Sequence, residues 1–419
     1  MIPRKRLDIG WGDIAFGIRR CLSGGDGEAA REWLENSWPS DRATPVARAA
    51  RGARAGPVAR AGLACLSVRS GFDALLQALD FPEGSEVLVS AVTIRDMPRI
   101  VEEHGLVPVP VDLDMRSLAV RPEALARAVT PKTKAILVAH VFGSRAPLEP
   151  VIRVAKERNL VVFEDCAQAY TADDYRGHPA SDVSMFSFGP IKTATALGGG
   201  ILCFRDAGLR DKTRECQSTW PTQGPRRFLK RLWKYAYLIA LSYRPAYSLF
   251  VAGCHAFGKN HDQIIAGSVR GFAGSDFFAG IRQKPSAPLL ALLERRLKQA
   301  DQRVVAKRVA RAQQAISLMP ALKRPGDQAA FHSHWVFPIL HAAPEELISY
   351  LWSRGFDATR GASSMAVVEP PADRPETEPA EARQAFAQLL YLPVYGGLSP
   401  RDVQRLANAV GEFGARKAA

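Results

Sequence analysis

The feature that most limits the folds open to this chain is an alternation of short β-rich runs and helical patterns between residues 63 and 204. Strands are predicted at residues 86–90, 107–111, 135–142 and 160–164, with helices at 73–79, 95–104, 122–128 and 148–158. Strand–helix alternation favours a mainly parallel sheet with helices on both faces. The predicted strands are nearly continuous apolar runs, which is typical when both faces of a sheet are covered. The sequence therefore predicts an α/β fold.

The 419 residues are enough for one large domain and a smaller one. Residues 1–60 are predicted to form an N-terminal arm with one or two short helices, one of them at 28–36. The large domain is predicted at 61–213, with further strands at 183–188 and 200–204, and a helical insertion rich in basic and aromatic residues follows at 214–275. Residues 276–419 are predicted to hold an interface helix at 288–309 and a small α/β C-terminal domain, with a strand at 334–340 and helices at 344–354 and 400–413.

Composition excludes several classes of protein. Apolar residues make up 47% and charged residues 23%, which excludes a wholly disordered chain, a collagen and a polytopic membrane protein. The 56 basic residues against 42 acidic ones give a net charge of +14. Such a charge suggests an anionic partner, either nucleic acid, a membrane surface or a phosphorylated substrate, although Arg-rich solvated faces would give the same balance.

The cysteines and the N-terminus predict a cytoplasmic protein. The six cysteines are scattered and form no C-x-x-C pair, which makes zinc and thioredoxin-type sites improbable, so no metal site is predicted. Sparse thiols in a chain of this size fit a reducing compartment. The basic start, Met1 to Arg6, is followed by no apolar signal-peptide core.

Two residues stand out as candidates for chemistry. Asp165 closes a predicted strand at the sheet edge where open α/β sheets bind ligands, although a lone Asp there is more often a helix cap. Lys192 follows a Gly-Pro turn and precedes three glycines at 198–200. A lysine in a crowded, partly apolar pocket loses its proton readily and becomes a nucleophile, whereas most lysines are simply solvated.

Together the two residues match the needs of pyridoxal phosphate. This cofactor requires a carboxylate that keeps its pyridinium nitrogen protonated and a lysine that holds its aldehyde as a Schiff base. It also needs a cradle for its phosphate, and the Ser70-Gly71 turn before a predicted helix offers one, because a helix N-terminus presents free N–H groups and a positive dipole end.

The ordered motifs resemble those of the DegT-type sugar aminotransferases, which are fold type I pyridoxal-phosphate enzymes. The resemblance is clearest from residue 66 to 204 and returns at 281–301 and 392–409. Each motif alone is weak, but the ordered set with family-like spacing is specific. The matching motifs are Glu164-Asp165-Cys166-Ala167-Gln168, Phe186-Ser187-Phe188-Gly189-Pro190-Ile191-Lys192, and the segments 130–136, 140–143 and 392–399.

The resemblance implies a role for each matched residue. Lys192 would form the internal aldimine and move the substrate proton, and Asp165 would pair with the pyridine nitrogen. Gln168 would approach the phenolic oxygen of the cofactor and Ser187 its phosphate. Backbone N–H groups of Gly71 and Phe72 would complete the phosphate site. The segment Arg282 to Ser286 aligns with one that reaches the neighbouring subunit's site, which implies a homodimer.

The chain departs from the family pattern in its cofactor site. Ser70 and Phe72 stand where the family has Asn and Thr, so one hydroxyl contact to the phosphate is lost. Ile94 replaces an aromatic residue that stacks on the cofactor ring, which leaves an apolar cover without the stack. Weaker cofactor binding or a reshaped pocket would follow.

The resemblance implies an aminotransferase that moves an amino group from an amino acid, with L-glutamate as the expected donor, to a keto-sugar or related ketone. Another pyridoxal-phosphate reaction, such as sugar dehydration, is a second hypothesis, although related dehydratases carry His in place of Lys192. That second reaction would act on a membrane- or lipid-linked substrate. A third hypothesis is a non-catalytic regulatory member of the fold.

The insertion has a pattern of its own. Residues 226–235 are basic with interleaved aromatic residues, and 235–254 are mostly apolar but interrupted at Arg244-Pro245. The interruption argues against a transmembrane helix and predicts two short helices. Such a segment could cover the active site, pack on a partner subunit, or meet a membrane interface through 226–258 at the inner face of the membrane. No nucleic-acid-binding motif supports contact with DNA or RNA.

Overall fold

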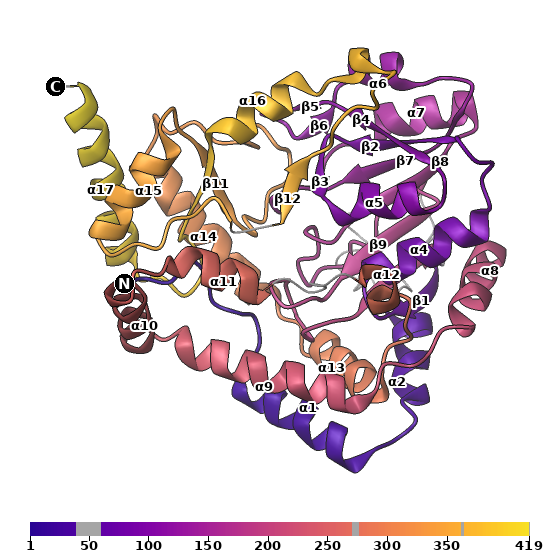
Figure 1. Ribbon diagram of the computed structural model, residues 1–419, viewed down its shortest axis with the longest axis horizontal. Coiled ribbons are helices and arrows are strands. Elements are labelled where there is room, and N and C mark those ends of the chain that lie inside the picture. Colours follow the sequence, from indigo (N-terminus) through magenta and orange to yellow (C-terminus); the bar gives the residue numbers. More distant parts are fainter. Residues whose placement is uncertain (39–59, 270–275, 362–363, 419) are drawn as a thin grey trace, which may run out of the picture.

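A computed structural model describes residues 1–38, 60–269, 276–361 and 364–418 (Figure 1). Its main sheet has the strand order β1-β10-β9-β8-β7-β2-β4. In chain order these strands are β1 Ala61–Cys65, β2 Glu86–Ser90, β4 Val107–Val111, β7 Thr133–Ala139, β8 Val161–Asp165, β9 Val183–Ser187 and β10 Gly200–Phe204. Both antiparallel pairings in this sheet involve β10, so β10 runs opposite to the other six strands. The other pairings are parallel, and the predicted mainly parallel α/β fold is confirmed.

Helices cover both faces of the sheet because its strands are apolar on both sides. In β7, Ala135 and Leu137 pack in the core with α4 (Val68–Leu79) and α5 (Asp96–Glu103). The alternate residues Ile136 and Val138 pack on the opposite face with α6 (Pro122–Ala128) and α7 (Glu149–Arg158). The period of two in a strand thus divides one apolar run between two cores.

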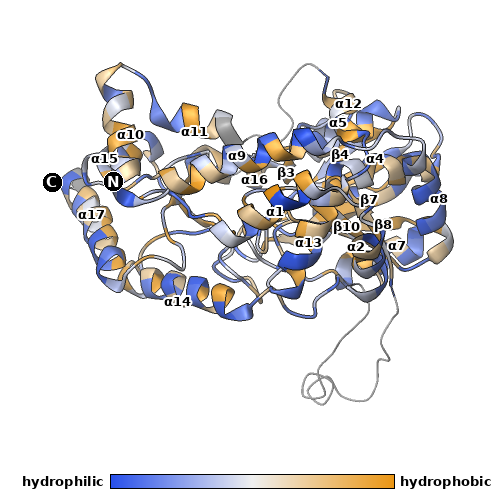
Figure 2. Cartoon of the chain, turned by 90° about the horizontal axis from the view of Figure 1, so that it is seen from below, coloured by the Kyte–Doolittle hydropathy of each residue, from blue (hydrophilic) through white to orange (hydrophobic). Residues whose placement is uncertain are grey.

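A second group of elements surrounds a small antiparallel pair, β11 (Phe337–Leu340) and β13 (Leu389–Leu392). The helices α14 (Gln302–Leu318), α15 (Pro344–Ser353) and α17 (Pro400–Ala418) pack around it. Along α14 and α17, hydrophilic and hydrophobic residues alternate as in amphipathic helices (Figure 2). The strand predicted from residue 334 begins later, because His334 has a left-handed φ of 49° that ends an extended strand.

The single helix predicted at 288–309 is wrong. The structure has two helices there, α13 (Ala287–Lys298) and α14, separated by residues 299–301. The Asp301 carboxylate accepts a hydrogen bond from the Arg303 N–H at 2.9 Å and caps α14. The amphipathic pattern of the sequence is continuous, but this N-cap starts a new helix within it.

A helical layer joins the N-terminal segment to the insertion. Helices α1 (Trp11–Ser23), α2 (Glu28–Glu32) and α13 share a core with α9 (Pro225–Leu241), which lies along α1 (Figure 1). Helix α10 (Arg244–Ala256) follows after a break, so the predicted pair of helices is confirmed, and α11 (His261–Val269) adds a third that was not predicted. No helix in the described part of the chain is long and apolar enough to cross a membrane.

The remaining elements complete the described chain. They are a π-helix at Trp33–Ser37, β3 Val92–Ile94, β5 Leu113–Asp114, β6 Ala119–Val120, α8 Ala207–Ser218, α12 Phe277–Ile281, β12 Met365–Val367, a 3-10 helix at Pro375–Thr377 and α16 Ala380–Gln388. Part of the predicted arm, 39–59, and part of the predicted insertion, 270–275, lie outside the described residues. The predicted domain boundaries at 61, 214 and 276 stay predictions.

Candidate cofactor and active site

Lys192 lies in the loop between β9 and β10. The loop is held by Thr195, whose hydroxyl donates to the carbonyls of Phe188 at 3.0 Å and Gly189 at 2.6 Å. The Lys192 Nζ atom lies 4.3 Å from the centroid of the Trp335 ring. Burial lowers the pKa of Lys192 to about 8, with Arg69 acting in the same direction and Asp165 opposing both. The side chain is thus much closer to a neutral amine at neutral pH than an ordinary lysine.

Asp165 is buried at the C-terminal end of β8. Burial raises the pKa of its carboxyl group, while the Ala167 N–H and the charge of Lys192 lower it. The Ala167 N–H, at 2.9 Å from Oδ1, is the one hydrogen-bond donor that the described residues give this carboxylate. Asp165 therefore keeps acceptor capacity for a ligand at the sheet edge.

The neighbouring carboxylate, Glu164, faces the other side of the strand and is fully engaged. It accepts hydrogen bonds from Ser184 Oγ at 2.9 Å and the His178 N–H at 2.7 Å, lies 2.8 Å from His140 Nε2, and also accepts from the Tyr175 hydroxyl. Burial acts to raise the pKa of Glu164, but these partners hold it well below its usual range. Glu164 is thus a structural anion behind Asp165.

Helix α4 begins at Val68, earlier than the helix predicted at 73–79. Ser67 is its N-cap, and its hydroxyl accepts from the Ser70 N–H at 3.2 Å and lies 3.0 Å from Ser70 Oγ. The Gly71 N–H already donates to the Ser67 carbonyl at 3.0 Å, and Phe72 is fully buried in the helix, against Phe163. The positive end of the helix dipole therefore lies at Ser67 and the first turn of α4. The predicted donors Gly71 and Phe72 come later in the helix than this end.

Ser67 was missed by the sequence reasoning, although a Ser before an apolar-periodic run is an N-cap signal. The structure explains why glycine starts β10 beside this turn. A Cβ atom at Gly200 would lie 2.7 Å from Val68 N and 2.8 Å from Ser67 C. The strand therefore presses directly on the backbone of the N-cap.

Gln168 and Ile94 meet at a small sheet that the sequence did not predict. The Gln168 Oε1 atom accepts from the Phe142 N–H at 2.8 Å, and its Nε2 lies 3.1 Å from Met365 Sδ. Ile94 pairs with Met365 across the antiparallel strands β3 and β12. Ser187 ends β9, half-buried, with its Oγ 3.5 Å from the Gly189 N. These side chains thus come from neighbouring strand ends, while their contacts to a cofactor stay predictions.

The donor set fits pyridoxal phosphate. An amine with a pKa near 8 suits the aldehyde, a buried carboxylate with spare acceptor capacity suits the pyridinium nitrogen, and the capped start of α4 with two serine hydroxyls suits the phosphate. Lys192 and Asp165 also act on each other's pKa. The fit rests on three separate chemical groups.

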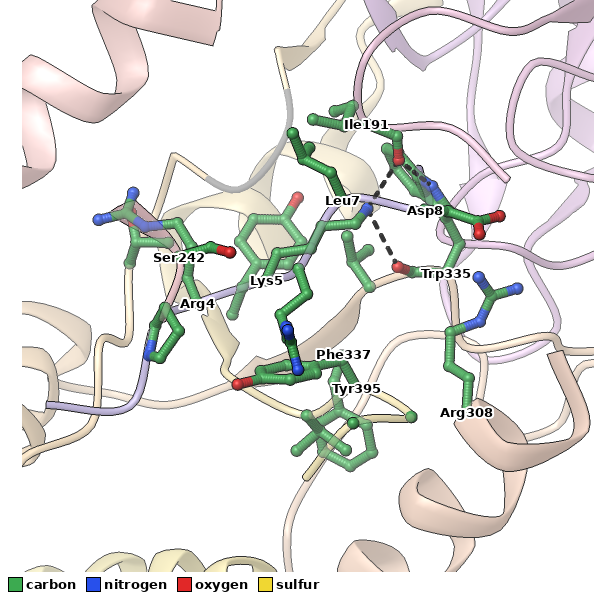
Figure 3. A pocket seen from close by; sticks show the side chains of 18 of the residues that line it. Arg4, Lys5, Leu7, Asp8, Ile191, Ser242, Arg308, Trp335, Phe337 and Tyr395 are labelled. Carbon is green, nitrogen blue, oxygen red and sulfur yellow. Dashed lines mark hydrogen bonds between the residues drawn. The ribbon is translucent and has the colours of Figure 1, made fainter. Parts of the chain in front are cut away.

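The N-terminal segment reaches this region, which sequence reasoning did not foresee. Lys5 Nζ donates to the Ile191 carbonyl at 2.9 Å and lies 4.1 Å from the centroid of the Trp335 ring (Figure 3). Asp8 accepts from the Ala194 N–H at 2.6 Å. The arm therefore braces the loop on both sides of Lys192.

The sequence of the chain is similar to those of known proteins. The model of the DegT/DnrJ/EryC1/StrS aminotransferase family matches residues 28–244. GDP-perosamine synthase of Escherichia coli O157:H7 is 35% identical over 33% of this chain and 38% of its own length. The UDP-N-acetyl-3-dehydro-alpha-D-glucosamine 3-aminotransferase of Acidithiobacillus ferrooxidans is 35% identical over 38% of this chain and 45% of its own length. The chain thus matches less than half the length of these relatives.

The fold is similar over the whole chain to that of a solved protein. The aminotransferase TlmJ of Streptoalloteichus hindustanus superimposes with a TM-score of 0.69, at 18% identity, and the match covers 100% of both chains. At this identity the likeness establishes the fold.

Proposed function

Because the chain belongs to the DegT/DnrJ/EryC1/StrS aminotransferase family, we propose that it transfers an amino group from an amino acid to a keto-sugar or related ketone. L-Glutamate is the proposed donor and pyridoxal 5′-phosphate the proposed cofactor. The observation that carries the proposal is the buried Lys192, with its pKa lowered to about 8 and with Asp165 close enough to act on it.

When bound, the cofactor supplies an electron sink for the carbon from which a proton is lost. Lys192 would hold the cofactor aldehyde, and its Nζ atom would accept and return the proton. Asp165, held by the Ala167 N–H, would keep the pyridine nitrogen protonated. The start of α4 would anchor the phosphate, and the Trp335 ring, 4.3 Å from the Lys192 amine, would shield it from water.

A direct test uses purified protein. It should show a visible absorbance band with the cofactor, erased by borohydride and absent in Lys192→Ala. A screen with L-glutamate and candidate keto-sugars should then show turnover that Lys192→Ala loses. Undiminished transamination by this variant would sink the assignment, and a wild-type protein without the band would favour the regulatory alternative.

We also propose that the protein acts as a homodimer. The segment Arg282 to Ser286, which aligns with a segment reaching the neighbouring subunit's site, is the support for this assembly. In the structure Arg282 pairs with Asp73 of α4 at 2.9 Å, which ties the segment to the helix that starts at the phosphate turn. Light scattering should give twice the mass of the chain, and an active monomer would contradict the proposal.

We propose further that α9 and α10 contact an anionic membrane surface from the cytoplasmic side. The exposed face of α9 carries Trp233 and Tyr237, 61% and 63% exposed, beside four exposed cations. On α10, Leu249 is 75% exposed, and Phe257 just beyond it is 81% exposed. The four cations, Arg226, Arg227, Lys230 and Lys234, would each contribute about 1 kcal/mol near such a surface.

One predicted member of this basic face points inward. Arg231 donates to the Leu197 carbonyl at 3.2 Å, and burial lowers its pKa. Phe228, Leu232 and Tyr235 are buried against α1 and α13, so only part of the aromatic pattern is available to lipid.

Vesicle sedimentation tests the membrane proposal. Anionic vesicles should bind the wild type at low salt, and Lys230→Glu with Lys234→Glu should abolish binding. The control Arg303→Glu changes a side chain that is 88% exposed on α14, and it should leave vesicle binding intact. If wild-type protein binds neither anionic nor neutral vesicles, the membrane proposal is wrong, and the segment is a subunit contact or an active-site cover.

A further inference from the structure

A cavity of about 470 Å³ is lined in part by Lys192, and no residue of α4 is among its lining residues. Its wall is built by segments far apart in the sequence. They are the N-terminal residues Pro3 to Asp8, the insertion helices α9 to α11, helix α14 and the strands β11 and β13 (Figure 3). Asp165, Ser70 and Ser187 are not among the lining residues, so the cavity adjoins the cofactor site without being it.

Lys5 and Arg308 belong to this wall and have no acidic partner among the described residues. Lys5 Nζ is hydrogen-bonded only to the Ile191 and Trp335 carbonyls, at 2.9 and 3.5 Å, as far as the described residues show. Arg308 donates from Nε to the Ser333 carbonyl at 2.8 Å, while its Nη2 is buried without a hydrogen-bond partner. Neither residue forms an ion pair with any described carboxylate. The wall thus contains positive charge that the protein does not neutralise.

The acidic side chain in the cavity lining, Asp8, is already engaged. Asp8 accepts from the Ala194 N–H at 2.6 Å and pairs with Arg296 at 3.4 Å. Burial lowers the pKa of Arg308 to about 10, with Asp8 opposing, and lowers that of Lys5 well below its ordinary value. Buried charges without partners are costly, and a bound anion would remove this cost.

The rest of the wall is largely apolar. The insertion contributes Leu238, Leu241 and Ile265, α14 contributes Val304, and the segment around β13 contributes Leu392 and Val394. A ligand that fills this space therefore needs an apolar body as well as an anionic group.

We propose that this cavity binds the ketone substrate, that Arg308 and Lys5 hold an anionic group of it, a carboxylate or phosphate, and that its apolar part lies against the insertion helices. The assignment of the ligand as the substrate rests on the proposed transamination. It makes the acceptor an amphipathic anion, and it gives the insertion a role in substrate selection.

Binding of a probe tests the cavity without turnover. Calorimetry on the cofactor-loaded protein compares decyl phosphate, inorganic phosphate and uncharged octyl glucoside. Decyl phosphate should bind the most tightly. Arg308→Gln should lower the affinity for decyl phosphate about 10- to 100-fold, which is the loss expected for a hydrogen bond to a charged group. Arg303→Gln, on the same helix but outside the cavity, should leave binding unchanged. Inorganic phosphate binding as tightly as decyl phosphate would overturn the apolar half of the proposal.

Three further measurements separate the alternatives. Arg308→Gln should retain the visible cofactor band, so failure of the cavity proposal is distinct from failure of the proposed function, in which the wild type lacks the band. The half-reaction with L-glutamate identifies the source of the anion. If Arg308→Gln slows this half-reaction and leaves decyl phosphate binding intact, the residue holds the donor's carboxylate and the proposal is overturned.

Leu241→Asn should weaken the binding of decyl phosphate but not that of inorganic phosphate. Equal weakening of the binding of both probes would count against an apolar wall.

Discussion

At the scale of single residues, the chemistry depends on how burial changes two ionisable groups in opposite directions. It lowers the pKa of Lys192 and raises that of Asp165, while each charge partly counteracts the shift of the other. A lysine whose pKa is lowered to about 8 gains and loses a proton readily near neutral pH, which suits proton transfer. The loop and strand that hold them therefore set the reactivity as well as the position.

The lowered pKa of Lys192 predicts the pH dependence of cofactor capture. Only the neutral amine attacks the aldehyde, so the rate should rise with pH and level off above about pH 8. An ordinary lysine would level off only above about pH 10. The measurement is the rate at which the visible band forms when cofactor is added to cofactor-free protein across this range. A midpoint near the ordinary lysine value would contradict the burial of the amine.

Asp165→Asn should slow transamination about hundredfold or more, by analogy with other positioned acid–base groups. The amide keeps the shape and can still accept from the Ala167 N–H, but it carries no charge to keep the pyridine nitrogen protonated. Single-turnover kinetics with L-glutamate measures the loss. A near-normal rate would mean that a different residue faces that nitrogen.

At the scale of elements, the turn proposed to bind the phosphate depends on three elements that meet. Ser67 caps α4, the first residue of β10 presses on that cap, and β1 pairs with β10 beside it. A helix start fixed in this way presents its N–H groups in one orientation, which is what an anion site requires.

Gly200→Ala tests this arrangement. The added methyl group would lie 2.7 and 2.8 Å from backbone atoms of Val68 and Ser67, so the turn must shift. Cofactor affinity should fall about tenfold or more, a cost of roughly 1.4 kcal/mol for each factor of ten. The control is Gly253→Ala in α10, where an added Cβ meets nothing within 4 Å. Unchanged affinity in Gly200→Ala, measured by fluorescence titration of the cofactor, would exclude the turn as the phosphate site.

At the scale of the whole molecule, one buried carboxylate ties three distant parts together. Asp357, next to the start of the chain, accepts from Arg4 Nε at 2.7 Å and from the Tyr247 hydroxyl of α10. His261 of α11 lies 3.4 Å away. The N-terminal arm, the insertion and the C-terminal unit therefore share a single charge cluster beside the cavity.

Arg4→Met should destabilise the fold by about 3–5 kcal/mol at neutral pH, because it leaves Asp357 buried without its main cation. Burial acts to raise the pKa of Asp357, but its partners lower this pKa overall. The Arg4–Asp357 pair therefore stabilises the wild-type fold fully above the ordinary Asp pKa of about 4. This stabilisation is lost as the pH falls through the lower pKa of the folded protein. Urea unfolding at about pH 7 and about pH 3 should show a smaller difference between the two proteins in acid. The control Arg303→Met removes an exposed ion pair and should cost about 1 kcal/mol or less.

Local patterns were sufficient for six of the seven strands of the main sheet and for the two central candidates, whereas β1 was not predicted. The bounds of β2, β4 and β10 follow from apolar runs that are readable residue by residue. Lys192 and Asp165 were singled out by their places after strands and by the order of the motifs around them. The period of an apolar pattern is a local property, so it predicts an element without knowledge of its neighbours.

Only the tertiary structure decided which distant side chains share one space. Arg231 looks like part of an exposed basic face in the sequence but turns toward the glycine loop, where it contacts the Leu197 carbonyl. Lys5 stands in the basic N-terminal segment and Arg308 in an amphipathic helix. Neither pattern predicts that they meet, yet they line the same cavity as Lys192. By itself the sequence determined the α/β fold and the candidate cofactor residues, because strand and motif signals are local. The cavity and its unpaired charges exist only after packing, because burial and charge pairing depend on contacts between residues far apart in the chain.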